Sequence, residues 1–211
     1  MNGKTVMACI EAAHSTLKEH TDEIAALDQQ IGDGDHIFNL LRGVDALFAM
    51  RADIEAALIG PALDLAASKL LSTVGGSSGP LFFSLLHGMA KAAGDAETMS
   101  VEGAAQMFAA GVDAVTQRGK AGIGSKTMMD VLIPVASRFV ELADSKAAPE
   151  TVLDALPLIA EEGMLATRDM LATKGRASFL GERARGHIDP GARSSQLMIG
   201  AVCARLAQYR E

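Results

Sequence analysis

Apolar residues recur at intervals of three and four positions along most of this chain, the spacing that places side chains on one face of a helix. Met7, Ile10, Ala13 and Leu17 show the pattern near the N-terminus. No segment shows the sustained alternation that is typical of a half-buried strand. We therefore predict an all-α bundle, formed as one domain over residues 1–211. The eight expected helices cover about 3–20, 36–51, 61–75, 79–93, 100–119, 126–144, 149–172 and 192–209.

The composition fits helices that pack closely against one another. Hydrophobic residues make up 49% of the chain, yet it has no Trp, one Tyr and seven Phe, so Ala, Leu, Met and Gly must fill the interior. Sheets would favour aromatic and β-branched residues instead. The formal charge of −7 argues against nucleic acid or an anionic membrane as a partner, because both attract basic surfaces.

Two further features bear on the location of the protein. Cys9 and Cys203 show no metal-ligand spacing and have apolar neighbours, so we expect buried thiols in a reducing compartment and no disulfide. Residues 70–90 lack Asp, Glu, Lys and Arg, but the run GGSSGP interrupts them and makes a membrane-spanning helix a poor interpretation. Since the N-terminus does not resemble a signal peptide, we expect a cytoplasmic protein.

The segment LDQQIGDGDHIFNLLRG, residues 27–43, carries the strongest chemical signal. Asp28, Asp33 and Asp35 fall within eight positions, and Gly32 and Gly34 loosen the backbone between them. Oxygen ligands on a flexible turn suit a hard cation such as Mg²⁺, and a helix that begins near Asp35 would favour a phosphate at the same place. The alternative is an ordinary D-G-D turn in which Asp35 is only a helix N-cap.

Many of the 21 glycines fall in four clusters between the expected helices, at 32–34, 75–79, 119–124 and 175–191. Glycine at such positions lets backbone N–H groups approach a ligand closely. Any single cluster is also explained as a helix C-cap. Four clusters together with the acidic turn favour a composite binding site.

Two of these clusters bring side chains that suit a nucleotide. GGSSGP offers the hydroxyls of Ser77 and Ser78 at a helix start, where phosphates bind readily, but it lacks the lysine and the spacing of a Walker A loop. RGKAGIGSKTMMD, residues 118–130, contains Met128 and Met129. A planar base could pack against these thioethers, although ordinary core packing is the commoner role of methionine.

Residues 173–191 form the longest stretch with weak helical character, and ordered loops of that length are usually functional. The stretch contains Arg176, Arg183 and Arg185. Arginines near a metal-bound phosphate neutralise the charge that develops in phosphoryl transfer. The alternative is a solvated basic loop.

Four blocks together point to a family. IGDGDH, VGGSSGPLF, RGKAGIGSKTMMDV and KGRASFLGERARGHIDPGA occur in this order and resemble the nucleotide-binding L subunit of dihydroxyacetone kinase. The resemblance spans most of the chain, from residue 28 to residue 192. It implies an antiparallel eight-helix barrel with the nucleotide site at one rim.

The resemblance also implies roles for individual residues. Asp28, Asp33 and Asp35 would ligate two Mg²⁺ ions that hold the phosphates of ADP or ATP, and Arg176 would be the catalytic residue. The expected nucleotide-binding residues are His36, Ile37, Phe38, Asn39, Ser77, Ser78, Gly119, Met128, Arg176, Asp189, Pro190 and Gly191. The chain departs from the family pattern at Ser125, where the family usually has an aspartate, which removes a charge next to the expected pocket.

The implied activity is phosphoryl transfer from bound ATP to dihydroxyacetone that is held on a separate K subunit. An M subunit of the phosphoenolpyruvate phosphotransferase system would rephosphorylate the ADP in place, since His36 directly after the acidic turn and the short separate chain resemble this type. Two alternatives remain open: the L subunit of an ATP-exchanging kinase for another small ketose such as erythrulose, and a nucleotide-loaded regulatory binding module. A homodimer is a further arrangement that the sequence leaves open.

Overall fold

The computed structural model describes residues 2–208, and every regular element in this range is a helix. Within it the α-helices are α1 (Gly3–Glu19), α2 (Thr21–Ile31), α3 (His36–Phe48), α4 (Arg51–Ala56), α5 (Ile59–Thr73), α6 (Ser78–Ala93), α7 (Val101–Gly119), α8 (Met129–Asp144), α9 (Pro149–Ala166) and α10 (Pro190–Ala207). Two 3₁₀ segments, η1 (Thr167–Asp169) and η2 (Arg176–Ala184), lie between α9 and α10. The prediction of an all-α fold is confirmed.

Eight of these helices correspond to the eight predicted ones, whereas α2 and α4 were not predicted. The helix α2 buries only four of its residues, one of which is an aspartate. Its apolar face is therefore too narrow to be recognised as a periodic pattern in the sequence. The helix α4 has six residues, fewer than two turns, so that no periodicity develops. Position 209, the expected end of the last helix, lies outside the described residues.

One predicted helix, 149–172, is too long, because α9 ends at Ala166. The hydroxyl of Thr167 donates to the carbonyl oxygen of Met164 at 2.7 Å, and the chain turns there into the 3₁₀ segment η1. The expected loop at 173–191 has more regular secondary structure than its sequence indicates, since it contains η2.

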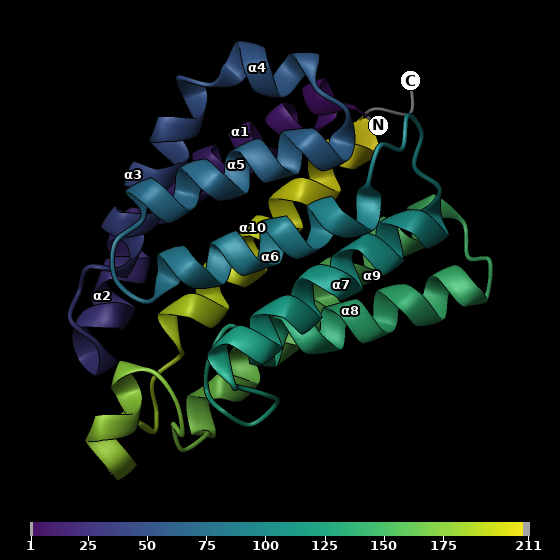
Figure 1. Ribbon diagram of the computed structural model, residues 1–211. Coiled ribbons are helices and arrows are strands. Elements are labelled where there is room, and N and C mark those ends of the chain that lie inside the picture. The colour runs from purple at the N-terminus through teal and green to yellow at the C-terminus, as the bar shows by residue number, and fades with distance from the viewer. Residues whose placement is uncertain (1, 209–211) are drawn as a thin grey trace.

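The eight longest helices pack in a closed cyclic order. α3 contacts α5, α5 contacts α6, and the contacts continue through α7, α8, α9 and α10 to α1, which contacts α3 again. Figure 1 shows the start of α1 and the end of α10 at one end of the molecule and the α2–α3 turn at the other. Elements from both halves of the chain therefore meet at the end that carries the acidic turn.

Small residues let neighbouring helices come close. A Cβ atom on Gly111 of α7 would lie 2.7 Å from the carbonyl oxygen of Leu85 on α6, and one on Gly88 of α6 would lie 2.9 Å from the carbonyl oxygen of Ala110. A real Cβ atom does not fit at these distances in a closely packed interior. These small residues thus allow the backbones of α6 and α7 to approach each other closely.

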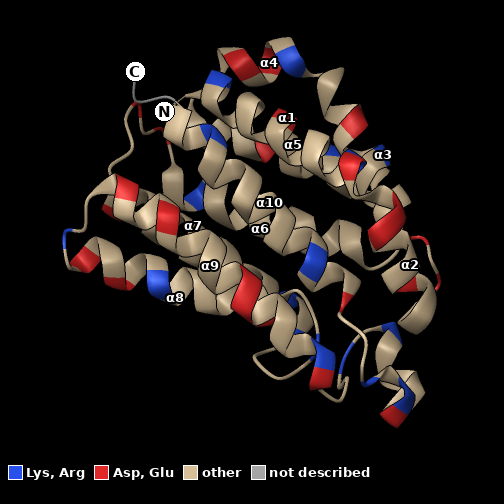
Figure 2. Cartoon of the chain, turned by 180° about the vertical axis from the view of Figure 1, so that it is seen from behind, with Lys and Arg blue, Asp and Glu red and all other residues tan. Residues whose placement is uncertain are grey.

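A small apolar cluster attaches the η2 segment to the rest of the fold. Ile31, at the end of α2, packs with Ala172, Ala177 and Ala184. These contacts place η2 beside the turn that follows α2. In Figure 2 this segment lies below α2 and carries both basic and acidic positions. Within residues 2–208, none of the helices combines the length and the apolar character that crossing a bilayer requires.

Replacing Gly111 with Ala should destabilise the protein, because the added methyl group would collide with the α6 backbone at Leu85. We expect the free energy of unfolding to fall by about 1–3 kcal/mol, as for other overpacked interiors, against a gain of up to about 1 kcal/mol in helix propensity. Gly200→Ala on α10 is the matched control, since nothing lies within 4 Å of its added Cβ atom. Urea unfolding followed by circular dichroism measures both variants, and equal stabilities would contradict the close approach of α6 and α7.

Candidate functional site

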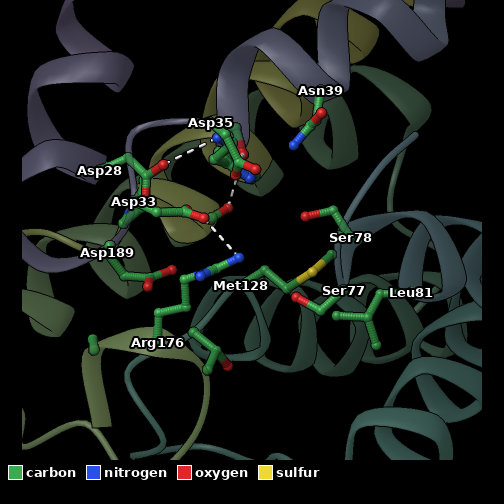
Figure 3. Close-up of a pocket in the computed structure, with 18 of the residues that line it drawn as sticks. Asp28, Asp33, Asp35, Asn39, Ser77, Ser78, Leu81, Met128, Arg176 and Asp189 are labelled. Atoms are coloured by element: carbon green, nitrogen blue, oxygen red, sulfur yellow. Dashed lines mark hydrogen bonds and ion pairs between the residues drawn. The ribbon is translucent and has the colours of Figure 1, made fainter. Parts of the chain in front are cut away.

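A cleft opens at the end of the molecule where the acidic turn lies (Figure 3). It holds about 830 Å³ of space, counted together with the open solvent at its mouth. The α2–α3 turn, the start of α6, the end of the α7–α8 loop, and η2 with the start of α10 all contribute to its walls. Four stretches that are distant in sequence thus share one cavity.

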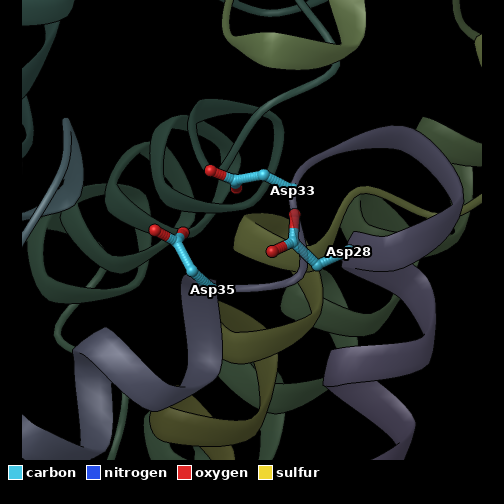
Figure 4. A group of neighbouring side chains, drawn as sticks. All are labelled: Asp28, Asp33 and Asp35. Carbon is cyan, nitrogen blue, oxygen red and sulfur yellow. The ribbon is translucent and has the colours of Figure 1, made fainter.

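The acidic turn brings three carboxylates together (Figure 4). Asp28 is buried on the last turn of α2, Asp33 and Asp35 are exposed, and oxygen atoms from all three lie within 4.8 Å of one another. Gly32 permits this approach, because a Cβ atom there would lie 2.0 Å from Asp28 Oδ1. Gly34 has a φ of 78°, in the left-handed region that favours glycine. The three oxygen ligands fit a hard divalent cation such as Mg²⁺.

Arg176 reaches the acidic turn from η2. Its Nη2 atom lies 2.6 Å from Asp33 Oδ2. The Arg176 side chain is 61% exposed, so the pair contributes at most about 1 kcal/mol and can give way to a more strongly charged partner. One guanidinium that faces three carboxylates leaves a net negative charge, which again favours a cation at this place.

The start of α3 faces the same cleft. Asp35 occupies the N-cap position but makes no side-chain capping hydrogen bond, so capping alone does not explain this residue. The backbone N–H of His36 donates to Asp28 Oδ2 at 3.0 Å, and His36 Nε2 lies 2.9 Å from Ser194 Oγ. Burial lowers the pKa of His36, against the raising effect of the nearby carboxylates, which favours the neutral imidazole.

Asn39 presents hydrogen-bond donors to the cleft. Arg42 Nη2 donates to Asn39 Oδ1 at 2.5 Å, and because a guanidinium only donates, the amide oxygen must face Arg42. The amide N–H₂ group is then directed into the cleft, as Figure 3 shows. Gly75 leaves room for this orientation, since a Cβ atom there would lie 3.0 Å from Asn39 Oδ1. Donors in this position suit an anion.

The start of α6 forms the wall across from the acidic turn. Ser77 occupies the N-cap position without a side-chain capping hydrogen bond, and Ser78 follows as the first residue of the helix. The first N–H groups of a helix have no partner within it and attract phosphates. Met128 and Leu81 lie next to the two serines (Figure 3) and give this side of the cleft an apolar surface.

The turn Asp189-Pro190-Gly191 closes the cleft at the start of α10. Asp189 Oδ2 accepts a hydrogen bond from Ala192 N at 2.8 Å, and Pro190 takes the first helical position, where no N–H group is needed. Burial raises the pKa of Asp189 to about 7, although the Ala192 hydrogen bond and the charge of Lys126 act against this rise. Asp189 thus both caps α10 and lines the cleft.

Most residues that the sequence singled out line this cleft. They are Asp28, Asp33, Asp35, His36, Asn39, Ser77, Ser78, Met128, Arg176, Asp189, Pro190 and Gly191. The lining does not include Ile37, Phe38 or Gly119. Ile37 is buried in the core and Phe38 is 53% exposed, because successive helical residues point in different directions and only the pair at positions 36 and 39 shares the cleft face.

Gly119 ends α7 behind the wall, where an added Cβ atom would lie 3.3 Å from Leu81 Cδ2. Arg183 and Arg185, the other arginines of the long loop, do not line the cleft either. Arg185 Nε instead pairs with Glu182 Oε2 at 2.8 Å.

Several lining residues were not predicted. Leu81 and Phe82 follow the GGSSGP run directly. An apolar pair after a phosphate-binding loop is a sequence signal that could have identified them as lining residues. Ser194 lines the cleft through α10 and contacts His36. Its position depends on how α10 packs against α3, so the sequence carries no local signal for it.

Known protein sequences are similar to this chain over most of its length. The model of the DAK2 domain family matches residues 30–204. A protein of Listeria innocua, "PEP-dependent dihydroxyacetone kinase 1, ADP-binding subunit DhaL", is 39% identical over 186 residues, which cover 88% of each chain. The corresponding ADP-binding subunit DhaL of Escherichia coli is 40% identical over 179 residues, 85% of each chain.

A solved structure agrees in fold. The dihydroxyacetone kinase of C. freundii, crystallised with AMP-PNP and Mg²⁺, superposes with a TM-score of 0.74 at 21% identity. The match covers 94% of this chain and 33% of that longer one. With matches of this extent to both the family model and the two bacterial subunits, the chain belongs to the DAK2 domain family and, within it, to the DhaL-type subunits of dihydroxyacetone kinase.

Proposed function

We propose that the chain is a cytoplasmic phosphotransferase subunit that binds ADP and ATP with Mg²⁺ and transfers the terminal phosphoryl group to dihydroxyacetone. The sugar is held on a separate K-type subunit, and an M-type subunit of the phosphoenolpyruvate phosphotransferase system rephosphorylates the ADP in place. The observation that carries this proposal is the cluster of three carboxylates within 4.8 Å that faces Arg176 and the start of α6 across one cleft.

The names of the relatives support the nucleotide and the phosphoryl donor. The Listeria and Escherichia proteins are each described as the ADP-binding subunit of a PEP-dependent kinase. The C. freundii enzyme was crystallised with an ATP analogue and Mg²⁺. Erythrulose kinases are less similar: the L-erythrulose 1-kinase of Mycolicibacterium smegmatis is 28% identical, and the match covers 36% of its length. Dihydroxyacetone is therefore the better supported ketose.

The side chains that line the cleft fit a nucleotide bound with Mg²⁺, and we assign their roles as follows. Asp28, Asp33 and Asp35 hold two Mg²⁺ ions, which shield the negative charge of the phosphates when bound. Asn39, through its amide hydrogens, and the start of α6 at Ser77 bind phosphate oxygens. The apolar surface of Met128, Leu81 and Phe82 borders the base.

Phosphoryl transfer depends on positioning and on charge neutralisation more than on a protein nucleophile. Arg176 is the group of this chain that supplies a mobile positive charge. Its exposed pair with Asp33 is weak, so the guanidinium can move to the phosphate once a cation neutralises Asp33. The η2 segment and the turn at Asp189 cover the cleft from one side and limit the access of water.

Asp35→Asn should weaken ADP binding in the presence of Mg²⁺ by at least about tenfold, because even the loss of an outer-shell partner of a metal ligand costs about 10–100-fold in metal affinity and the loss of a ligand should cost no less. Asp53→Asn is the matched control, since it removes the same charge from the exposed surface of α4. Isothermal titration with ADP and Mg²⁺ measures both variants. If D35N binds ADP as tightly as D53N does, the assignment of Asp35 as a metal ligand is wrong.

Arg176→Met should slow transfer to dihydroxyacetone by at least about a hundredfold, because the residue acts on charge that develops in the transition state. We expect a smaller change, within about tenfold, in ADP affinity. The control is Arg183→Met, an exposed arginine of the same loop that does not line the cleft. Transfer is followed with the K-type and M-type partners present. Similar rates for R176M and the wild type would remove Arg176 from the mechanism.

A further inference from the structure

Lys126 is a lysine with no exposed surface, which is unusual for this residue type. Its Nζ atom lies 2.5 Å from the carbonyl oxygen of Thr167, 2.5 Å from that of His187 and 3.4 Å from that of Arg168. An ammonium group has three donors and no acceptor, so three carbonyl oxygens match its hydrogen-bonding capacity. We call this arrangement, the Lys126 ammonium with its three carbonyl partners, the Lys126 clamp.

The three carbonyl groups lie at the two ends of one segment. Thr167 and Arg168 begin η1, directly after α9, and His187 comes shortly before α10. The segment between them contains η2 and Arg176. Further hydrogen bonds join the same two ends: Gly186 N donates to Arg168 O at 2.8 Å, and Asp189 N donates to Thr167 Oγ1 at 3.1 Å. The clamp therefore closes the base of the segment.

Lys126 is itself held firmly in the α7–α8 loop. Its φ of 59° lies in the left-handed region. On either side of it, the buried carboxylate of Asp130 accepts hydrogen bonds from Gly124 N at 2.5 Å and from Thr127 N at 2.8 Å. The carbonyl oxygen of Ser125 also accepts from Thr173 N at 3.2 Å. The loop that carries Met128 is thus joined rigidly to the segment that carries Arg176.

The other attachments of this segment are weaker. The Arg176–Asp33 pair is exposed to solvent, and the apolar cluster with Ile31 uses three alanines, which bury little surface. Leu180 of η2 is partly buried against this cluster, whereas Phe179 is 87% exposed and adds little packing against the fold. Charge-assisted hydrogen bonds from a buried donor are stronger than these contacts.

We propose that Lys126 is a positioning residue for phosphoryl transfer, which fixes the base of the segment so that Arg176 and Asp189 face the acidic turn. The proposal rests on the proposed function. Lys126 does not line the cleft and acts only through the residues that it holds. A purely structural lysine would instead affect the whole fold to a similar degree.

Lys126→Met tests the clamp, because methionine keeps an unbranched apolar stem and loses the three donors. We expect trypsin to cut the segment at Lys174, Arg176, Arg183 or Arg185 at least about tenfold faster, since local opening controls cleavage. ADP affinity with Mg²⁺ should fall by about tenfold or more, while Mn²⁺ binding without nucleotide should change by less than about threefold, because the three carboxylates remain in place. Lys120→Met is the matched control: Lys120 belongs to the same loop, also has a positive φ, and is exposed.

A double variant separates positioning from general stability. With Mg²⁺ and nucleotide at saturating concentration, so that the weaker binding of K126M does not enter, the transfer rate of K126M/R176M should lie within about threefold of that of R176M alone, since Lys126 acts on transfer through Arg176. Additive losses would contradict the proposal. K126M with wild-type ADP affinity and wild-type cleavage would overturn it while leaving the proposed function intact. Failure of the wild type to bind ADP with Mg²⁺ would overturn both.

A measurement on the wild-type protein tests the clamp without requiring that any variant folds. An amine-acylating reagent should modify Lys126 at least about tenfold more slowly than Lys120 in the native protein, because the clamp opens only transiently. Added ADP with Mg²⁺ should slow the reaction at Lys126 further and leave Lys120 unaffected. Equal acylation rates at the two lysines, read by peptide mass spectrometry, would show that the clamp is not formed.

Discussion

Three carboxylates with oxygen atoms within 4.8 Å of one another repel each other unless positive charge lies between them, and the rest of the site is arranged around this constraint. One carboxylate, Asp28, accepts a hydrogen bond from the start of α3, and another, Asp33, pairs with Arg176. Neither contact neutralises the cluster. A divalent cation does so, and its remaining coordination positions then attract phosphate oxygens. We propose that metal and nucleotide binding are for this reason parts of one process in this chain.

The helical fold supplies what such a site requires. Helix starts offer unpaired N–H groups, and the cyclic packing of the long helices brings the starts of α3, α6, α8 and α10 to one side of the molecule. Close helix contacts at Gly88 and Gly111 hold these ends in place. The Lys126 clamp joins two of the loops and thereby connects the apolar wall at Met128 to the charged wall at Arg176.

The helical class could be predicted from the apolar period alone, and most of the cleft from the acidic turn and the glycine clusters together with the resemblance to the L subunit of dihydroxyacetone kinase. The apolar period of the long helices is visible in the chain, and the acidic turn and the glycine clusters stand next to the helix starts that use them. The rest depends on tertiary packing. The short helices α2 and α4 have too little apolar surface to show a period, and Ser194 enters the cleft only because α10 packs beside α3. Ile37 has the right neighbours in sequence, but the rotation of α3 places it in the core.

The most direct test of the account is a measurement of what the chain holds when it is purified natively with Mg²⁺ and without added nucleotide. After denaturation, released adenine nucleotide and metal are quantified per chain. The account predicts close to one ADP and two Mg²⁺ per chain, since the ADP remains bound while it is rephosphorylated. A folded protein that carries no nucleotide and binds none when ADP and Mg²⁺ are added would contradict it.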